Sequence, residues 1–179
     1  MTALGLGDPQ HFGTNHLPDQ DGAYGLNAYR TTDGWLMLTL GLSELFGKVS
    51  DDPAVSGWGF ELTMRVVDGS QPDAPPQWAL KLLLKLSQYV YQQGRPFAPG
   101  HRMSPGGPIT GSPDTRLTAL AFATDPQLPG ISTPNGSVQF LTVVGITTDE
   151  LATMQATSTD HVLSDLRAHY STLATDITR

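Results

Sequence analysis

Residues 57–65 read Gly57-Trp58-Gly59-Phe60-Glu61-Leu62-Thr63-Met64-Arg65. From Phe60 onward, apolar and polar side chains alternate one by one as far as Val66. Because successive side chains of a β-strand point to opposite faces, this pattern predicts a strand that is buried on one face only. We therefore expect a half-buried strand over Phe60–Asp68, with its polar residues on the exposed face.

Strands are also expected on both sides of this stretch. Tyr24–Arg30 and Trp35–Leu40 flank Asp33-Gly34, a dipeptide typical of tight hairpin turns, so these two strands should pair antiparallel. Further along the chain, strands are expected over Leu117–Thr124 and Ser137–Gly145. The second of these follows a Pro-Asn-Gly sequence, which again has the composition of a hairpin turn.

Helices are expected in three places. The first covers Gln77–Gln93 and stops at the glycine that follows, since glycine adopts the left-handed conformation that ends many helices. A capping box of Thr147 and Glu150 opens a helix over Asp149–Thr157, and a last helix is expected over Asp160–Thr175. Strands and helices in this mixed order indicate the α/β (α+β) class, with a mixed, largely antiparallel β-sheet and helices packed on it.

The chain divides into a loosely structured N-terminal lead-in over residues 1–22 and a single domain over residues 23–179. The lead-in is rich in Gly, Asp, Asn, Gln and Pro, and we expect at most one short helix in it, near Pro9. Between Pro96 and Pro113 lie five prolines and four glycines, too many for regular structure. We expect a long surface loop there, of the kind that often carries function.

The composition disfavours several classes of partner and site. The chain carries 17 acidic and 10 basic residues, a formal net charge of −7, and no run of Lys or Arg. Nucleic acid and anionic membranes need clustered cations, so we expect neither, and a basic protein partner fits better. Cysteine is absent, so no disulfide or thiolate site forms. Residues 1–8 lack the basic and apolar regions of a signal peptide, and we expect a cytoplasmic protein.

The sequence motifs give little support for a nucleophilic serine or a metal site. Ser43 follows a strand, but Leu45 stands where a nucleophile elbow has its second glycine, so Ser43 is expected to cap a helix. The histidines show neither an i,i+4 pair nor the carboxylate pattern typical of zinc sites. They are His11, His16, His101, His161 and His169. We expect no metal and no cofactor.

Glu44 and Glu61 are the carboxylates of interest, because each lies in apolar sequence beside glycine and aromatic residues. If the fold brought them together with His101, the three groups could perform general acid–base chemistry. The alternative is that Glu61 pairs with Arg65 or another cation along a strand and that Glu44 caps a turn.

Tyr89 and Tyr91 point to opposite sides of one predicted helix. One of them is therefore expected to reach the surface near the loop between Pro96 and Pro113. Exposed tyrosines of this kind often serve as anchors in protein interfaces.

The order of these segments resembles the suppressor-of-fused domain, in particular its compact single-domain bacterial form. Each motif alone is modest, and the resemblance rests on their ordered series over roughly residues 11–170. The matching motifs are Gly41-Leu42-Ser43-Glu44-Leu45, Gly57-Trp58-Gly59-Phe60-Glu61-Leu62-Thr63-Met64-Arg65, Pro75-Pro76-Gln77-Trp78, Gln88-Tyr89-Val90-Tyr91, Phe97-Ala98-Pro99-Gly100-His101, Asp125-Pro126-Gln127-Leu128, Thr133-Pro134-Asn135-Gly136-Ser137-Val138-Gln139-Phe140-Leu141 and Val144-Gly145-Ile146-Thr147-Thr148-Asp149-Glu150-Leu151.

The resemblance implies a binding protein. The animal family member is non-enzymatic and sequesters zinc-finger transcription factors, gripping a short extended peptide between two domains. This chain resembles the N-terminal one of those domains. The tyrosine of the animal peptide site corresponds to Tyr89, while a key loop aspartate falls at or beside His101. Bacterial relatives are proposed to be immunity proteins that neutralise a toxin made by the same cell.

We therefore expect a cytoplasmic, non-enzymatic protein-binding module, most plausibly an immunity-type protein whose partner is a toxin domain, basic in charge. The expected partner-binding residues are Tyr89, Tyr91, His101, Arg102, Glu44 and Glu61. The alternatives are a hydrolase-like enzyme that uses Glu44, Glu61 and His101, a regulator that sequesters another protein, and a structural or oligomerising domain. The oligomeric state is left open.

Overall fold

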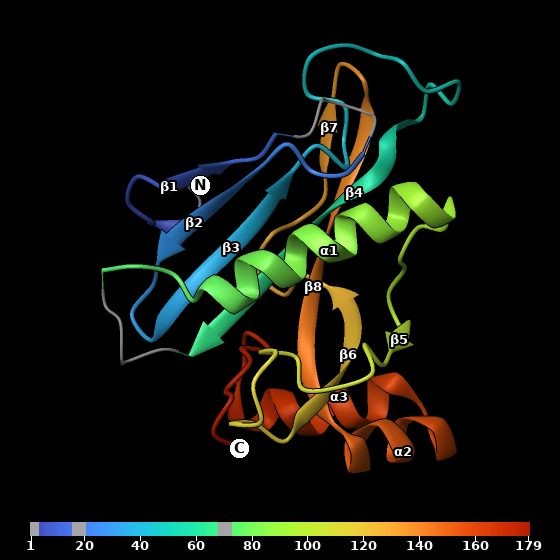
Figure 1. The fold of residues 1–179 in the computed structure, drawn as a ribbon. Helices are drawn as coiled ribbons and strands as arrows, with labels where there is room; N and C mark the ends of the chain where they lie inside the picture. Colours follow the sequence, from blue (N-terminus) through green and yellow to red (C-terminus); the bar gives the residue numbers. More distant parts are fainter. Residues whose placement is uncertain (1–3, 16–20, 68–72) are drawn as a thin grey trace.

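The computed structural model describes residues 4–15, 21–67 and 73–179. In these residues, eight strands form one sheet and three helices pack against it (Figure 1). The strands are β1 (Gln10–Gly13), β2 (Gly25–Arg30), β3 (Gly34–Leu40), β4 (Val55–Val67), β5 (Arg102–Met103), β6 (Leu117–Thr124), β7 (Ile131–Thr133) and β8 (Gly136–Thr147). The helices are α1 (Gln77–Gln93), α2 (Thr148–Ala156) and α3 (Thr159–His169).

The strand order is β1-β2-β3-β4-β8-β6-β5, with β7 paired to the first part of β8. Paired strands run antiparallel apart from β4 and β8, which are parallel. The chain passes through α1 and three strands between β4 and β8, and this crossover lets the two lie side by side in the same direction. The mixed, largely antiparallel α/β (α+β) class expected from the sequence is confirmed.

Gly57 and Gly59 shape the first part of β4. Their φ angles are 57° and 81°, a region that residues with a side chain rarely adopt. A Cβ atom at Gly57 would lie 2.7 Å from the carbonyl oxygen of Leu42. The pairing of β4 with β8 shifts register between Val55 and Phe60, so this segment bends over the loop after β3.

Helices cover both faces of the sheet. On β6, Leu120 and Phe122 belong to the core cluster that includes the buried residues of α1, while Ala119 and Ala121 belong to the cluster under α2 and α3. The small alanine side chains let those two helices approach the sheet closely. In Figure 1, α1 lies across one side of the sheet, and α2 and α3 lie together at one end of β6 and β8.

The prediction that β4 is half-buried is wrong. Glu61, Thr63 and Arg65, on its polar face, are 3%, 0% and 5% exposed. β4 is a central strand, and the loop after β3 together with Asp125 covers this face through hydrogen bonds. Asp68, the expected last residue of the strand, lies outside the described residues.

The first helix has the predicted bounds, whereas the last helix is shorter than predicted. The bounds of α1 are those predicted, and Gly94 ends the helix in the left-handed conformation. The last helix was expected to reach Thr175 but ends at His169. Thr175 instead joins β4, since its N–H donates to the Arg65 carbonyl and its carbonyl accepts from the Val67 N–H. These two bonds hold the end of the chain in an extended form.

The N-terminal residues contain a strand where a loose lead-in was expected. β1 pairs with β2 from Gln10↔Ala28 to Gly13↔Gly25. Pro9 directly precedes this strand, so the short helix expected near it is not formed. The part of the lead-in that includes His16 lies outside the described residues. The division of the chain at residue 22 stays a prediction.

Candidate functional site

A hollow of about 180 Å³ opens at the C-terminal end of α1, beside β5. Half-buried Tyr89 stacks on Phe97 with ring centroids 5.7 Å apart, and Phe97 stacks on Phe122 at 4.1 Å. Because Phe122 is fully buried, this row of rings fixes Tyr89 to the core while part of it stays at the surface. The hollow is lined by Tyr89, Arg95, Pro96, Phe97, His101, Arg102 and Met103.

His101 extends the sheet toward this hollow. Its carbonyl accepts from the N–H of Phe122, and the Gly100 N–H donates to the Phe122 carbonyl. The side chain is exposed, and its Nδ1 accepts from the N–H of Ala98 at 3.2 Å. A neutral imidazole that accepts at Nδ1 carries its proton on Nε2, so the ring presents a donor to the surroundings.

β5 is the edge strand of the sheet on this side. Arg102 lies opposite Ala121, and the next bond of the ladder runs from Phe122 N–H to the His101 carbonyl. In an antiparallel pair, this pattern turns the N–H and C=O of Arg102 away from β6, toward the open edge. The Arg102 side chain donates to the hydroxyl of Thr159, which itself donates to the Gly100 carbonyl. The start of α3 therefore supports the edge.

Tyr91 points to the other side of α1 and takes no part in this hollow. Its hydroxyl donates to the Gly41 carbonyl at 2.7 Å, and its ring meets Trp58 edge to face at 5.5 Å. The prediction that the two tyrosines diverge is confirmed. Tyr89 is the one that lies beside the loop, whereas Tyr91 fastens the helix to the turn after β3.

Glu61 organises that turn with neutral donors. Its Oε1 accepts from the N–H groups of Gly41 and Ser43, both at 2.9 Å, and from the Ser43 hydroxyl at 2.7 Å. Its Oε2 accepts from the Thr39 hydroxyl at 2.6 Å. Burial raises the pKa of Glu61 above 4.5 and outweighs these hydrogen bonds, which act to lower it.

Two expectations about this turn are wrong. Glu61 does not pair with Arg65, because Glu61 accepts hydrogen bonds from the turn after β3 whereas Arg65 donates to Asp125, which follows β6. Ser43 does not cap a helix either: its hydroxyl donates to Glu61, and the described residues that follow it form bends.

Glu44 does cap a turn, as the alternative expected. Its Oε1 accepts from the backbone N–H groups of Val49, at 2.7 Å, and Ser50, and the Lys48 ammonium lies 3.2 Å from Oε2. Burial acts to raise the pKa of Glu44, but the N–H groups of Ser50, Val49 and Gly57, together with Lys48, outweigh it and lower the pKa to about 2. Glu44 thereby stabilises the loop over residues 44–50. This loop has three exposed apolar side chains: Leu45, Phe46 and Val49.

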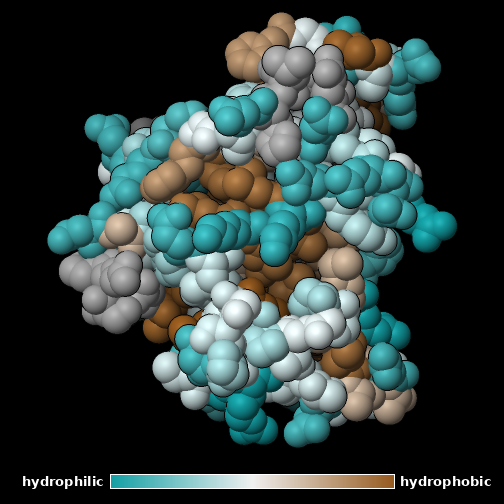
Figure 2. Space-filling model, in the orientation of Figure 1, coloured by the Kyte–Doolittle hydropathy of each residue, from teal (hydrophilic) through white to brown (hydrophobic). Residues whose placement is uncertain are grey.

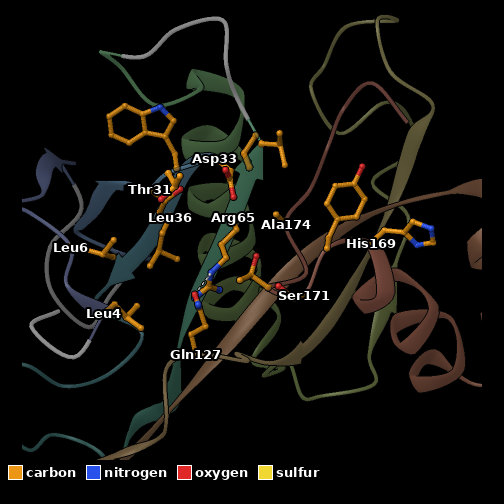
Figure 3. A pocket seen from close by; sticks show the side chains of 16 residues that line it. Leu4, Leu6, Thr31, Asp33, Leu36, Arg65, Gln127, His169, Ser171 and Ala174 are labelled. Atoms are coloured by element: carbon orange, nitrogen blue, oxygen red, sulfur yellow. Dashed lines mark hydrogen bonds between the residues drawn. The ribbon is translucent and has the colours of Figure 1, made fainter.

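Arg65 and Asp125 form a buried ion pair near a larger hollow, of about 340 Å³. Two guanidinium nitrogens donate to Asp125 at 2.6 and 3.0 Å, and Arg65 also donates to Gln127. Figure 3 shows Arg65 and Gln127 pointing toward each other and His169 pointing away from them. Burial acts to raise the pKa of Asp125, but Arg65 outweighs it and lowers the pKa. This network holds β4 to the segment after β6.

The six expected binding residues thus fall into two groups. Tyr89, His101 and Arg102 line one hollow, whereas Tyr91, Glu44 and Glu61 belong to the turn after β3. Neither Glu44 nor Glu61 lines the hollow at His101, so the catalytic triad of the hydrolase alternative is not assembled there.

The described part of the chain contains no group of three or more His, Cys, Asp or Glu side chains that could hold a metal ion. None of its helices is long and apolar enough to cross a membrane.

Fold and site together define an α+β domain with an open edge strand next to an aromatic hollow. The sequence model of the family described as suppressor of fused protein (SUFU) matches residues 23–179. Human and mouse suppressor of fused homologs are each 34% identical over 138 residues. The match covers 74% of this chain and 28% of each relative's length. The chain belongs to the suppressor of fused family.

Solved structures agree with this assignment. A chain from the crystal structure of the Sufu–Fu complex has a TM-score of 0.86 at 28% identity, over 96% of this chain and 83% of that one. Drosophila Suppressor of Fused has a TM-score of 0.78 at 30% identity, over 89% and 43% of the two chains. A homolog from Neisseria gonorrhoeae shares the fold, with a TM-score of 0.68 at 12% identity, over 99% and 89%.

Sequence reasoning missed a third hollow, of about 490 Å³, on the same side of α1 as the hollow at Tyr89. It lies between the helix and the glycine-rich end of the loop after β5. Its lining consists of Trp78, Lys81, Leu82, Lys85 and Pro105–Gly111. Trp78, Lys81 and Lys85 have helical spacing in the sequence, which was the available signal for this hollow.

Proposed function

We propose that this chain is a non-enzymatic protein-binding module that holds an extended segment of another protein along the open edge of β5. The observation that carries the proposal is the position of that edge. The outward N–H and C=O of Arg102 adjoin the hollow at Tyr89, so one segment can pair with the backbone and seat a side chain at the same time.

The family comparisons support a binding role. A relative of the same fold, 28% identical to this chain, was crystallised in the Sufu–Fu complex. This complex supports binding to another protein, and a regulator that sequesters its partner is one form that such binding can take.

The state of the two carboxylates supports the non-enzymatic part of the proposal. Glu61 accepts four hydrogen bonds within the turn after β3, and Glu44 accepts backbone N–H groups of its own loop. A general base needs free lone pairs directed at a substrate, whereas these carboxylates accept hydrogen bonds from the protein itself.

The narrower proposal is an immunity-type protein in the cytoplasm that neutralises a toxin. The toxin partner rests on the resemblance to bacterial relatives, and the cytoplasmic location on a cysteine-free composition. Co-expression with a toxin encoded beside it, with growth as the readout, tests this point separately from binding as such.

Affinity purification from the native lysate, followed by mass spectrometry, tests the binding role. Wild type is compared with Tyr89→Ala/His101→Ala and with the matched pair Phe46→Ala/His161→Ala, which alters exposed residues away from the hollow. We expect a partner that wild type and the matched pair retain and the first variant loses. Thermal melts of all three proteins check that the variants fold. Equal recovery by all three would move the site elsewhere, and no recovery would count against the binding role.

A further inference from the structure

Charge is unevenly distributed along this acidic chain. Residues 74–113 contain Lys81, Lys85, Arg95 and Arg102 and no Asp or Glu, although the chain as a whole has a net charge of −7. This segment comprises α1, the long loop that follows it and β5, so four of the ten basic residues lie in one part of the fold with no acidic residue between them in the sequence.

The fold places this segment on one continuous surface. Trp78, Leu82, Lys85 and Tyr89 are spaced by four, three and four residues, which brings them onto one stripe of α1. Trp78, Leu82 and Lys85 line the hollow at the N-terminal half of the helix, and Tyr89 lines the hollow at its C-terminal end. One helix stripe therefore connects the two hollows.

The cations of this surface are available to a partner. In the described residues, no ion pair includes Lys81, Lys85, Arg95 or Arg102, and neither hollow is lined by an acidic side chain. All four residues are exposed. In Figure 2, hydrophilic side chains form a band across the front of the molecule, where α1 lies, and hydrophobic surface shows on both sides of it.

We infer that the segment bound at this surface is an acidic stretch of protein that carries aromatic or large aliphatic side chains. The inference rests on the proposed function and specifies its partner. Asp and Glu side chains pair with the exposed lysines and arginines, while apolar side chains enter the hollows beside Trp78 and Tyr89. The eleven residue steps from Trp78 to Tyr89 span about 16 Å, so an extended segment of about five residues reaches both hollows.

The partner expected from net charge alone, a basic protein, does not match this surface. The acidic residues that give the chain its net charge lie outside residues 74–113. Nucleic acid fits less well than an acidic protein segment, because its regular phosphates would also meet the negative field of the rest of the molecule. Apolar hollows between the cations suit protein side chains.

Panning of a phage library of random twelve-residue peptides against the full chain tests the inference. We expect the enriched sequences to contain more Asp and Glu than the starting library, together with aromatic residues. Enrichment of neutral or basic sequences would overturn the acidic assignment and leave the proposed function standing. A library that yields no enriched sequence would overturn the proposed function itself.

The best peptide, labelled with fluorescein, is then measured by fluorescence anisotropy. Lys81→Glu/Lys85→Glu should weaken its binding at least tenfold, as should replacement of its Asp and Glu by Asn and Gln. The control Arg116→Glu/Arg167→Glu makes the same change in net charge elsewhere on the surface and should stay within twofold. Equal weakening by both variants, or equally tight binding of a single-stranded DNA oligonucleotide, would contradict the inference.

Discussion

Glu61 shows how a buried carboxylate can serve the fold without a counter-ion. Glu61→Ala leaves the N–H groups of Gly41 and Ser43 without their acceptor, and we expect a loss of at least about 2 kcal/mol in the free energy of unfolding. Glu61→Gln keeps an oxygen in this place and should cost less than about 1 kcal/mol. Urea unfolding at pH 7 measures both. Equal losses would show that these hydrogen bonds do not hold the turn.

Wild type and Glu61→Gln together test the raised pKa of Glu61. A folded pKa above 4.5 means that the folded protein binds this proton more tightly than the unfolded chain does. The contribution of Glu61 to stability is therefore full below pH 4.5 and decreases as the pH rises through the folded pKa. Wild type should lose stability relative to Glu61→Gln over this range. Parallel stability curves would contradict the shift.

Glu44 should titrate in the opposite direction. Its pKa of about 2 lies below the ordinary 4.5, so its contribution to stability is present above pH 4.5 and is lost as the pH falls toward 2. The amide NMR signals of Val49 and Ser50, which donate to this carboxylate, should shift with a midpoint near pH 2. A midpoint near 4.5 would mean that these bonds do not favour the charged form.

The bend at the start of β4 depends on glycine. Gly57→Ala combines a positive φ with a Cβ atom 2.7 Å from the Leu42 carbonyl, and we expect a loss of about 2 to 4 kcal/mol. Gly107→Ala is the matched control, because nothing lies within 4 Å of its Cβ and its φ is unremarkable for a side chain. Urea midpoints compare the two. A small effect at Gly57 would mean that the segment can straighten.

Substitutions at Arg102 test whether a partner segment pairs with the backbone of edge strand β5. Arg102→Pro removes the outward N–H without touching the bonds to β6, whereas Arg102→Ala removes only the side chain. If a partner segment pairs with this edge, the proline variant should bind the recovered partner at least tenfold more weakly than the alanine variant, as measured by isothermal titration calorimetry. Equal binding by the two variants would rule out strand pairing at Arg102.

Elements with local signals were predictable from the sequence. The glycine that follows the apolar segment places the end of α1, and the capping box of Thr147 and Glu150 places the start of α2. The burial of Arg65 and its ion pair could not be predicted, because its partner Asp125 is sixty residues away and no local pattern reveals the pairing. The end of α3 was overestimated for the same reason, since Thr175 bonds with β4.

The six residues predicted to bind a partner lie in two separate parts of the molecule. Tyr89, His101 and Arg102 share a hollow, while Tyr91 and the two glutamates build the turn after β3. Tyr91 could not be told from Tyr89 by helical spacing alone, because its hydroxyl partner, Gly41, lies fifty residues away. The absence of acidic residues from residues 74–113 was visible in the sequence, but its meaning depends on the stripe of α1 that connects the hollows.

Hydrogen–deuterium exchange of the protein, alone and bound to its recovered partner, tests the binding surface most directly. Slower exchange on binding is expected in residues 95–104, where the Arg102 N–H would gain an acceptor. Exchange in residues 44–50, the loop that carries exposed Leu45, Phe46 and Val49, should stay unchanged. Protection of that loop with unchanged exchange at β5 would contradict the proposed surface.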